Sequence, residues 1–254
     1  MTAYRLRAFE SADRELERLR SQVRAGLSVE APVYEAHGLL EAGDVVDVGA
    51  GSGEPARWMQ RAGLRVTCVD LDPHILAHAP ADARRLVARA DALPFPNATF
   101  GGAFTRFLLQ HVPDPQAVVS EMARVVRPGG LVLAMDTDVR SFVSHPEIPT
   151  GEEARRAWVE HARANGADPH VGVRLRSLFV GSGCTDVRTS VLTVTSDTVG
   201  RETFADVALS PHARVVFRGD PERLDRAERE LGAWIAEEGA FGSVTLFVTS
   251  GRAP

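Results

Sequence analysis

Hydrophobic positions near the start of the chain recur at helical spacing. Between residues 9 and 25, apolar side chains stand three or four positions apart with charged residues between them, which predicts an amphipathic helix. Ser11 is the candidate N-cap of that helix. A shorter helical segment is expected at 33–40, and Gly43 ends it. We therefore expect residues 1–40 to form an N-terminal helical cap.

A different pattern follows, in which short β-branched runs alternate with helical segments of about 10–15 residues. Such alternation implies βαβ units and a mostly parallel sheet. The pattern predicts strands at 45–48, 64–70, 84–88, 103–107 and 131–136, and helices at 55–59, 73–78 and 116–126. Beyond residue 139 it predicts helices at 152–164, 173–180, 201–209 and 221–238, and strands at 187–195 and 243–250. The whole favours an α/β fold.

The first of these strands ends in a glycine-rich turn. Gly49, Gly51 and Gly53 stand at alternate positions, where glycine allows positive φ and removes the Cβ that would collide with a ligand. The helix that follows directs its free N–H groups at whatever binds there. By itself, such a stretch also fits a tight strand-to-helix turn. Asp70 favours a binding site, because it ends the next strand, where an open α/β sheet places a carboxylate that accepts both hydroxyls of a ribose.

Two features narrow the class of ligand. The turn reads G-x-G-x-G and not the dinucleotide pattern G-x-G-x-x-G, and all 29 basic residues are arginine. Without lysine, the Gly-Lys-Ser/Thr phosphate loop and the Tyr-x-x-x-Lys pair of many reductases are both excluded. The alternative role for Asp70 is a helix N-cap, but Asp72 is the better placed cap ahead of Pro73. A ribose-bearing ligand with little or no phosphate fits these features.

Composition and charge exclude further classes. With 254 residues, 44% hydrophobic and 25% charged, the chain has the composition of an ordinary globular protein. It has no apolar run near the roughly 18 residues of a membrane span and no apolar signal core at its start, so we expect a cytoplasmic protein without a membrane partner. A net charge of −5 and the lack of a basic, aromatic-interleaved run disfavour nucleic acids. Cys68 and Cys184 are too few for a disulfide framework, and no His/Asp/Glu cluster has metal spacing, so no metal is expected.

Five motifs between residues 45 and 136 resemble those of the class I S-adenosylmethionine-dependent methyltransferases. They come in the order and spacing of that family, and the most similar members are small-molecule enzymes of quinone biosynthesis and natural-product tailoring. The motifs are VVDVGAGSG at 45–53, VD at 69–70, ADALPF at 90–95, LQHVPD at 109–114 and VRPGG at 126–130. One departure is the entry of the fourth strand, where relatives often have Phe-Asp and this chain has Phe100-Gly101.

The resemblance implies a fold. We expect a Rossmann-like, doubly wound α/β sheet of seven mostly parallel strands with an antiparallel last strand. The methyltransferase domain would span 41–254, with substrate-facing insertions at about 139–170 and 197–240. The N-terminal cap would close over the cofactor as a lid.

The resemblance also implies S-adenosylmethionine as the cofactor and a set of residues that bind it. Asp70 would hold the ribose hydroxyls, and Leu71 would pack on the adenine. Asp91 and Ala92 would hydrogen-bond the adenine, although Asp91 also fits a simple turn residue. The residues implied along the methionine and ribose portion are Asp47, Gly49, Ala50, Gly51, Gly53, Thr105, Arg106 and Gln110.

Methyl transfer needs a nucleophile behind the methyl group and, where the nucleophile carries a proton, a base. His111 is the first candidate base, because it follows the fourth strand and imidazole titrates near neutrality; the alternative is that it only pins the loop. Asp136 and Asp138 follow the fifth strand at the same edge, either to orient or deprotonate a substrate or as solvated turn residues. Other histidines are expected at the surface, with lining of the pocket as the alternative: His145, His161 and His170.

These residues together predict methyl transfer from S-adenosylmethionine to an O, C or N atom of a small, lipophilic or aromatic molecule in specialised metabolism. The alternative is a protein of the same scaffold that binds the cofactor without methylating, as a cyclisation catalyst or a regulatory subunit. A nicotinamide-dependent oxidoreductase is disfavoured by the spacing of the turn. A homo-oligomer is compatible with the sequence. The aromatic residues of the added segments would provide apolar surface for the substrate or else pack those segments on the sheet: Phe142, Trp158, Phe179, Phe204 and Trp234.

Overall fold

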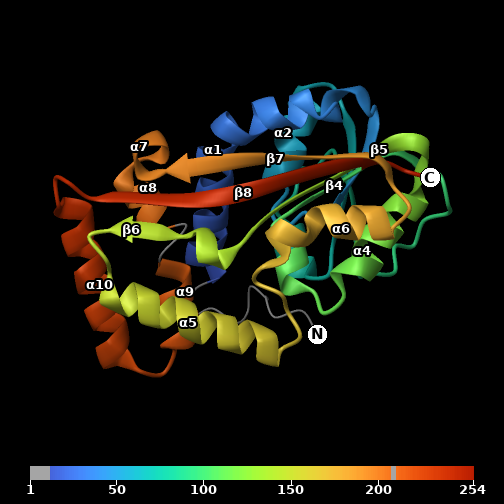
Figure 1. Ribbon diagram of the computed structural model, residues 1–254. Coiled ribbons are helices and arrows are strands. Elements are labelled where there is room, and N and C mark those ends of the chain that lie inside the picture. Colours follow the sequence, from blue (N-terminus) through green and yellow to red (C-terminus); the bar gives the residue numbers. More distant parts are fainter. Residues whose placement is uncertain (1–11, 207–209) are drawn as a thin grey trace.

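A central β-sheet organises the computed structural model, which describes residues 12–206 and 210–254 (Figure 1). Eight strands within these residues form the sheet in the order β3-β2-β1-β4-β5-β8-β6, with β7 paired to β8. The strand order reverses between β1 and β4, which is where sheets of this kind bind ligands. The strands are β1 (Asp44–Val48), β2 (Arg65–Asp70), β3 (Arg84–Val87), β4 (Phe100–Arg106), β5 (Val126–Thr137), β6 (Val143–His145), β7 (Thr185–Thr195) and β8 (Phe241–Arg252).

The five neighbouring strands β3, β2, β1, β4 and β5 are parallel. Strand β8 runs antiparallel to β5, β6 and β7. The expected Rossmann-like α/β sheet with an antiparallel last strand is confirmed. Within the described residues it has eight strands where the sequence predicts seven, because Val143–His145 adds the short strand β6 beside β8. Three residues are too few for a period-two pattern to be visible in the sequence.

Three of the described α-helices begin at an aspartate N-cap. Asp72, Asp114 and Asp220 each precede a proline, and each accepts a backbone N–H from the first turn of its helix. Asp72 is thus the cap that the sequence indicates. The α-helices are α1 (Ala12–Ala36), α2 (Glu54–Arg61), α3 (Pro73–Leu76), α4 (Pro115–Val125), α5 (Pro149–Ala164), α6 (Leu175–Gly181), α7 (Ser196–Val199), α8 (Arg201–Phe204), α9 (Ser210–Val216) and α10 (Pro221–Ala236). Short 3₁₀ helices are η2 (Leu39–Glu41), η3 (Leu109–His111), η4 (Val139–Ser141) and η5 (Val171–Arg174).

The first helix differs from the sequence prediction. α1 continues to Ala36 through Pro32, where the hydrophobic pattern predicts two separate segments. The helix continues because its carboxyl half is anchored in the interior: Glu30 and Tyr34, one turn apart, are 1% and 0% exposed. The cap residue Ser11 lies outside the described residues.

The helices of the last third also differ from the prediction. The helix predicted at 201–209 is represented by α8, which ends at Phe204, and residues 207–209 lie outside the described ones. The four-residue α7 and the seven-residue α9 are not predicted by the sequence. Both are too short to show a helical period clearly.

Each face of the sheet carries its own hydrophobic core. On one face, Val45 and Leu133 pack with Tyr34 of α1 and Met59 of α2. On the other face, residues such as Val46 pack with α4 and α6. Alternate residues of β1 are therefore buried on both faces, as in parallel sheets covered by helices.

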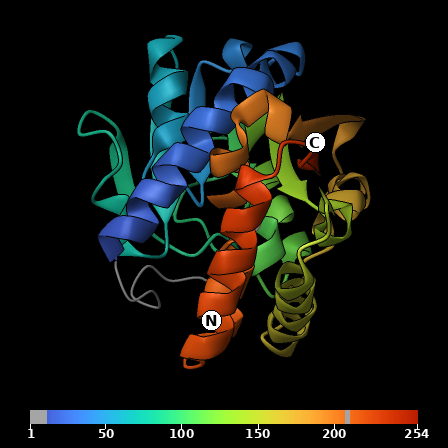
Figure 2. The ribbon, with the colours of Figure 1, turned by 90° about the vertical axis from the view of Figure 1, so that its left-hand side faces the viewer.

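A lobe of three helices, α5, α9 and α10, lies at one end of the sheet (Figures 1 and 2). Small clusters of its own hold it together, around Trp158 and around Phe217. Among the described residues, no helix is both long enough and apolar enough to cross a membrane.

Candidate functional site

The carboxyl ends of the parallel strands meet at one edge of the sheet, and the predicted site residues lie along it. β1 runs directly into the turn Gly49–Gly53, and Asp70 ends β2 beside it. Open α/β sheets bind their ligands at this edge. A cavity of about 510 Å³ lies at the opposite edge, lined by residues from the amino ends of β1, β2 and β3 such as Asp44 and Arg65, and is separate from the motifs.

The three glycines of the turn all have positive φ, but their surroundings differ. Their φ angles are 75°, 54° and 72°, a region that other residues adopt only with strain. A Cβ on Gly49 would lie 2.9 Å from the side chain of Leu108, and one on Gly53 would lie 2.6 Å from Pro80. A Cβ on Gly51 would meet only Ile75, at 3.7 Å. The space beside Gly51 is therefore open to a ligand, whereas the other two glycines allow close packing.

The backbone N–H groups of the turn are largely used within the protein. Gly49 and Ala50 donate to Val69 O at 2.8 and 3.0 Å, and Gly53 donates to Ala50 O at 2.9 Å. Gly51 N donates to Asp70 Oδ2 at 2.9 Å. A phosphate cradle needs several such groups turned toward the anion. The turn therefore suits a ligand that brings little or no phosphate.

Asp47 lies beneath the turn and has an unsatisfied carboxyl oxygen. The residue is 1% exposed, and its Oδ2 has no hydrogen-bond partner among the described residues. Burial, followed by the charge of Asp70, raises the pKa of Asp47 to about 7, while Arg106 acts in the opposite direction. A buried carboxyl oxygen without a partner is costly. A ligand that brought a hydrogen-bond donor or a positive charge would satisfy it, so Asp47 fits a cationic cofactor.

Asp70 is held by the backbone of the same edge. Its two carboxyl oxygens accept the N–H groups of Gly51 and Asp72, each at 2.9 Å. Burial raises the pKa of Asp70, and these two N–H groups oppose that rise. A carboxylate has about four acceptor sites, so the orientation given by two N–H groups leaves capacity for ribose hydroxyls.

The residues predicted around the adenine lie between β2 and β4. Leu71 is half-buried directly after β2. Asp91 forms a two-bond ion pair with Arg89, which lowers the pKa of Asp91. The Ala92 N–H, predicted to face the adenine, donates to Arg89 O at 3.3 Å. The adenine roles of these residues stay predictions.

Two side chains predicted near the methionine end are already engaged by protein groups. Thr105 is fully buried, and its Oγ1 donates to Val48 O at 2.8 Å. Arg106 donates two hydrogen bonds to Glu30 of α1, at 2.8 and 2.7 Å. Tyr34 donates to the same Glu30 at 3.0 Å. Arg106 therefore links the end of β4 to α1.

Glu30 and Tyr34 are site neighbours that the sequence prediction missed. Their spacing of four residues places them on one face of a helix, which is the signal that could have found them. Pro32 between them reads as a helix break, and the two-segment prediction separated them from the sheet.

The candidate catalytic residues lie where β4 and β5 end. Asp136 is fully buried, and its oxygens accept the N–H groups of Gln110 and Thr137 at 3.1 and 3.0 Å. Burial raises the pKa of Asp136 to about 7 against these hydrogen bonds. Asp136 thereby fastens the loop that carries Gln110 and His111 to β5. The ring of His111 lies 6.2 Å from that of Trp158 in the lobe, edge to face.

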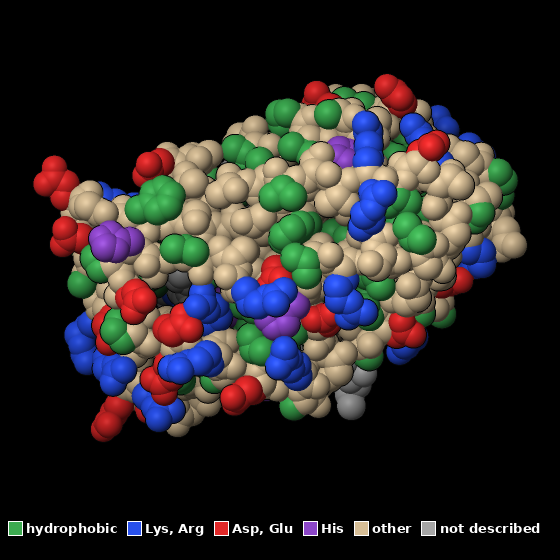
Figure 3. All heavy atoms as spheres, in the orientation of Figure 1, with side chains coloured by type: hydrophobic (Ala, Val, Ile, Leu, Met, Phe, Trp, Pro, Cys, Tyr) green, Lys and Arg blue, Asp and Glu red, His purple; other side chains and the backbone are tan. Residues whose placement is uncertain are grey.

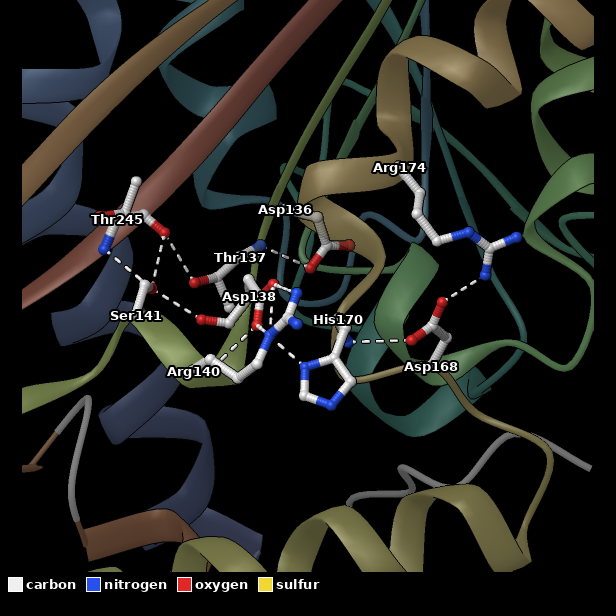
Figure 4. A network of polar contacts seen from close by, with 9 residues as sticks. All are labelled: Asp136, Thr137, Asp138, Arg140, Ser141, Asp168, His170, Arg174 and Thr245. Atoms are coloured by element: carbon white, nitrogen blue, oxygen red, sulfur yellow. Dashed lines mark hydrogen bonds and ion pairs between the residues drawn. The ribbon is translucent and has the colours of Figure 1, made fainter.

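A second polar network follows β5 (Figure 4). Asp138 is 3% exposed and accepts hydrogen bonds from Arg140 and from His170 Nδ1, the latter at 2.9 Å. Asp168 accepts the His170 N–H at 3.0 Å and pairs with Arg174 at 2.5 Å. His170 is therefore not the surface histidine that the sequence suggests. Over the described parts of the chain, no group of three or more His, Cys, Asp or Glu side chains is placed to hold a metal ion.

A family model described as "Methyltransferase domain" matches residues 46–134. That span contains most of β1, the glycine turn, Asp70, the loop after β4 and most of β5. It therefore covers the part of the sheet edge described above and leaves out α1 and the lobe.

Two curated relatives each match less than half of the chain. Demethylmenaquinone methyltransferase of Tropheryma whipplei is 34% identical over 114 residues, which cover 42% of this chain and 47% of that protein. The 27-O-demethylrifamycin SV methyltransferase of Amycolatopsis mediterranei is 37% identical over 126 residues, covering 45% and 44%. The chain thus spans about half the length of the curated relatives it matches.

Solved structures resemble a larger part of the fold. A candidate methyltransferase from an antibiotic biosynthesis pathway of Anabaena variabilis has a TM-score of 0.59 at 16% identity and covers 80% of this chain and 90% of that chain. Phosphoethanolamine N-methyltransferase 2 of Haemonchus contortus, in complex with S-adenosylhomocysteine, has a TM-score of 0.54 at 20% identity and covers 84% and 49%. At these identities the likeness concerns the fold alone.

Proposed function

The chain carries a class I S-adenosylmethionine-dependent methyltransferase domain, and from this premise we propose that it transfers the methyl group of that cofactor to a small lipophilic or aromatic molecule. The observation that carries the proposal is the buried, unsatisfied oxygen of Asp47, in the strand that runs into the turn where Gly51 leaves open space. When bound, S-adenosylmethionine supplies a methyl group on a cationic sulfur, ready for in-line displacement.

Different residues of the sheet edge are proposed to bind different parts of the cofactor. Asp47 would accept a hydrogen bond at the methionine end, and Asp70, oriented by two N–H groups, would accept the ribose hydroxyls. Gly51 leaves room for the backbone and ligand to approach closely. Leu71 and Asp91 would border the adenine. These contacts bind and orient the cofactor, and orientation is the main contribution a protein makes to such a transfer.

The acceptor side is proposed to lie between the sheet edge and the lobe. Phe179, Phe204 and Trp234 are at most 3% exposed, so these three pack the added segments onto the sheet. Phe142 is half-buried, and Trp158 lies next to His111. Trp158 is itself 9% exposed and packs in a hydrophobic cluster of the lobe. Of these five aromatic residues, Phe142 therefore keeps the most surface for a substrate. Relatives that act on demethylmenaquinone and on demethylrifamycin support a lipophilic or aromatic acceptor and a role in specialised metabolism.

The surface supports a small-molecule acceptor rather than a nucleic acid. Acidic and basic side chains are interleaved over the lobe, where Glu153 pairs with both Arg223 and Arg226 (Figure 3). A nucleic-acid site would instead gather basic residues on one face. We further propose that α1 acts as the cap of the cofactor site, since Glu30 ties it to Arg106 at the end of β4.

Calorimetric titration with S-adenosylhomocysteine and with NAD tests the cofactor. We expect S-adenosylhomocysteine to bind and NAD not to bind, and the reverse result would contradict the proposal. Incubation with methyl-labelled S-adenosylmethionine and a panel of phenols, hydroquinones and amines then tests transfer. Tight binding without a labelled product from any acceptor would favour the non-methylating alternative.

A further inference from the structure

Asp138 and His170 form a carboxylate–imidazole pair just beyond the carboxyl end of β5 (Figure 4). His170 Nδ1 lies 2.9 Å from Asp138 Oδ1, and the two side chains are 16% and 4% exposed. The carboxylate is thus shielded from water, while part of the imidazole stays accessible.

The backbone holds His170 at the ligand edge of the sheet. Val139 N donates to Pro169 O at 3.0 Å, directly beside the pair. A Cβ on Gly172 would lie 2.7 Å from the carbonyl carbon of Thr137, so η5 lies directly on the end of β5. These contacts place His170 next to the strand end that carries Asp136.

The same strand end is joined to the loop after β4. Asp136 accepts the Gln110 N–H at 3.1 Å, and the Phe107 N–H donates to Met135 O at 2.9 Å. η3 of this loop packs against η5, which follows His170. The order along the edge is therefore the glycine turn after β1, the loop with His111 after β4, and the Asp138–His170 pair after β5.

The charges around the pair favour an ionised Asp138 with the proton on Nδ1 of His170. Burial works to raise the pKa of Asp138, but hydrogen bonds from Arg140 and His170 outweigh it and lower that pKa. The ionised carboxylate accepts a hydrogen bond from the Nδ1–H of His170. In a neutral imidazole, this places the free lone pair on Nε2. Among the described residues, Nε2 has no hydrogen-bond partner. The other charged or titratable groups on the elements packed here are Arg140, Asp136, Asp168, Arg174 and His111.

We propose that His170, oriented by Asp138, is the general base of the methyl transfer and that the acceptor is a phenol or alcohol methylated on its oxygen. The inference rests on the proposed function. The acceptor O–H bond breaks and its proton passes to His170 Nε2, while the oxygen forms a bond to the methyl carbon. The carbon–sulfur bond breaks, and its electron pair stays on sulfur. The imidazolium then releases its proton to water.

Asp138 is a positioning residue in this scheme, whereas His170 touches the substrate. Asp136 is the less suitable base, because it is fully buried and its oxygens already accept backbone N–H groups. A carboxylate that holds an imidazole in one tautomer is a recurrent way to make histidine a base.

The first test compares His170→Gln and Asp138→Asn with the unsubstituted protein, using phenols of graded acidity as acceptors. With a weakly acidic phenol near neutral pH, each substitution should lower kcat by about 100-fold, the usual contribution of a positioned base. With a phenol already ionised at the assay pH, the loss should be far smaller. His78→Gln, at an exposed position after α3, serves as the matched control and should keep full kcat.

The second test does not depend on turnover. Acylation of His170 by diethyl pyrocarbonate, followed by mass spectrometry of its peptide, reports the unprotonated Nε2. We expect ready modification in the unsubstituted protein and a several-fold slower reaction in Asp138→Asn. An unreactive His170, or equal rates in both proteins, would overturn the pairing.

The outcomes separate this inference from the proposed function. If the unsubstituted protein binds no S-adenosylhomocysteine or methylates no acceptor, the proposed function fails and the inference falls with it. If methyl transfer occurs but His170→Gln keeps full kcat on weakly acidic phenols, or the products are methylated only on carbon or nitrogen, the inference alone is overturned.

Discussion

Arg106 and Glu30 form a doubly hydrogen-bonded ion pair in the interior, where β4 meets α1. Their N···O distances are 2.8 and 2.7 Å, and the side chains are 7% and 1% exposed. Burial of two charges is unfavourable unless hydrogen bonds satisfy the remaining groups. Tyr34 contributes such a bond to Glu30, at 3.0 Å. The pair joins the proposed cap to the strand that ends at the cofactor site.

The ion pair predicts a large effect of removing one partner. Glu30→Ala should lower the free energy of unfolding by about 3–5 kcal/mol, because an uncompensated guanidinium stays buried. Replacing both partners, as in Glu30→Leu with Arg106→Met, should recover much of that loss. Urea unfolding measures both. Arg229→Ala, in an ion pair whose side chains are 66% and 65% exposed, is the control and should leave the midpoint unchanged. A Glu30→Ala midpoint equal to that of the unsubstituted protein would contradict the buried pair.

Two glycines in helix interiors should respond oppositely to alanine. A Cβ on Gly26 would overlap the Glu30 carboxylate and come within 3.0 Å of Arg106, so Gly26→Ala should destabilise the protein despite the better helix propensity of alanine. A Cβ on Gly232 of α10 would meet nothing within 4 Å, so Gly232→Ala should stabilise it by about 0.5–1 kcal/mol. Thermal unfolding of the two variants checks the signs. A rise in stability for both would show that Glu30 moves aside freely.

Asp70 is predicted to hold the ribose. Asp70→Ala should weaken the binding of S-adenosylhomocysteine more than about tenfold, since a charge-assisted hydrogen bond contributes about 1.5–3 kcal/mol. Calorimetric titration gives the dissociation constant. Asp82→Ala, at an exposed position of the opposite sheet edge, is the control. An unchanged affinity in Asp70→Ala would remove the ribose role.

The raised pKa of Asp47 predicts a pH dependence of stability. The pKa is about 7 in the folded protein against an ordinary 3.8, so the folded state keeps a proton that the unfolded chain has released above about pH 4. This contribution is complete below about pH 4 and is lost as the pH rises through about 7, amounting to roughly 4 kcal/mol at 1.36 kcal/mol per pKa unit. Asp47→Asn should therefore reduce the fall in unfolding free energy between pH 5 and pH 8.

Urea unfolding at the two pH values measures that slope. Asp136, whose pKa is also about 7, adds to the slope in both proteins and so leaves their difference intact. An equal slope with and without the Asp47 carboxyl would show that it is ionised in the folded protein throughout this range.

His111 is predicted to act in turnover and not in cofactor binding. His111→Ala should lower kcat while the affinity for S-adenosylhomocysteine stays unchanged, because its ring lies toward Trp158 of the lobe. Because His170 is the proposed base, His111→Ala should keep the ascending limb of the kcat profile over pH, whereas His170→Gln should lose it. Full turnover in His111→Ala would assign His111 to packing the loop.

The glycine turn, the helix cap and the strand pattern could be predicted from the sequence, because each depends on residues close together in the chain. Gly49, Gly51 and Gly53 need positive φ, and each has it. Asp72 caps its helix because a short carboxylate before proline can reach the next N–H groups. The alternation of strands and helices predicts the parallel sheet, and the sheet brings Asp47 and Asp70 to one edge.

The contacts between distant segments were decided only by the tertiary structure. Glu30 and Arg106 are 76 residues apart, and Asp138 and His170 are 32 apart. No periodicity links such positions, because their contact depends on strand order and on how α1 and η5 pack against the strand ends. The continuity of α1 through Pro32 has the same origin, since burial of Glu30 and Tyr34 outweighs the local preference of proline. The sequence by itself thus determined the fold class and the glycine turn at the end of β1, because their backbone preferences are local. Tertiary packing determined which charged side chains are paired, because only burial brings those partners together.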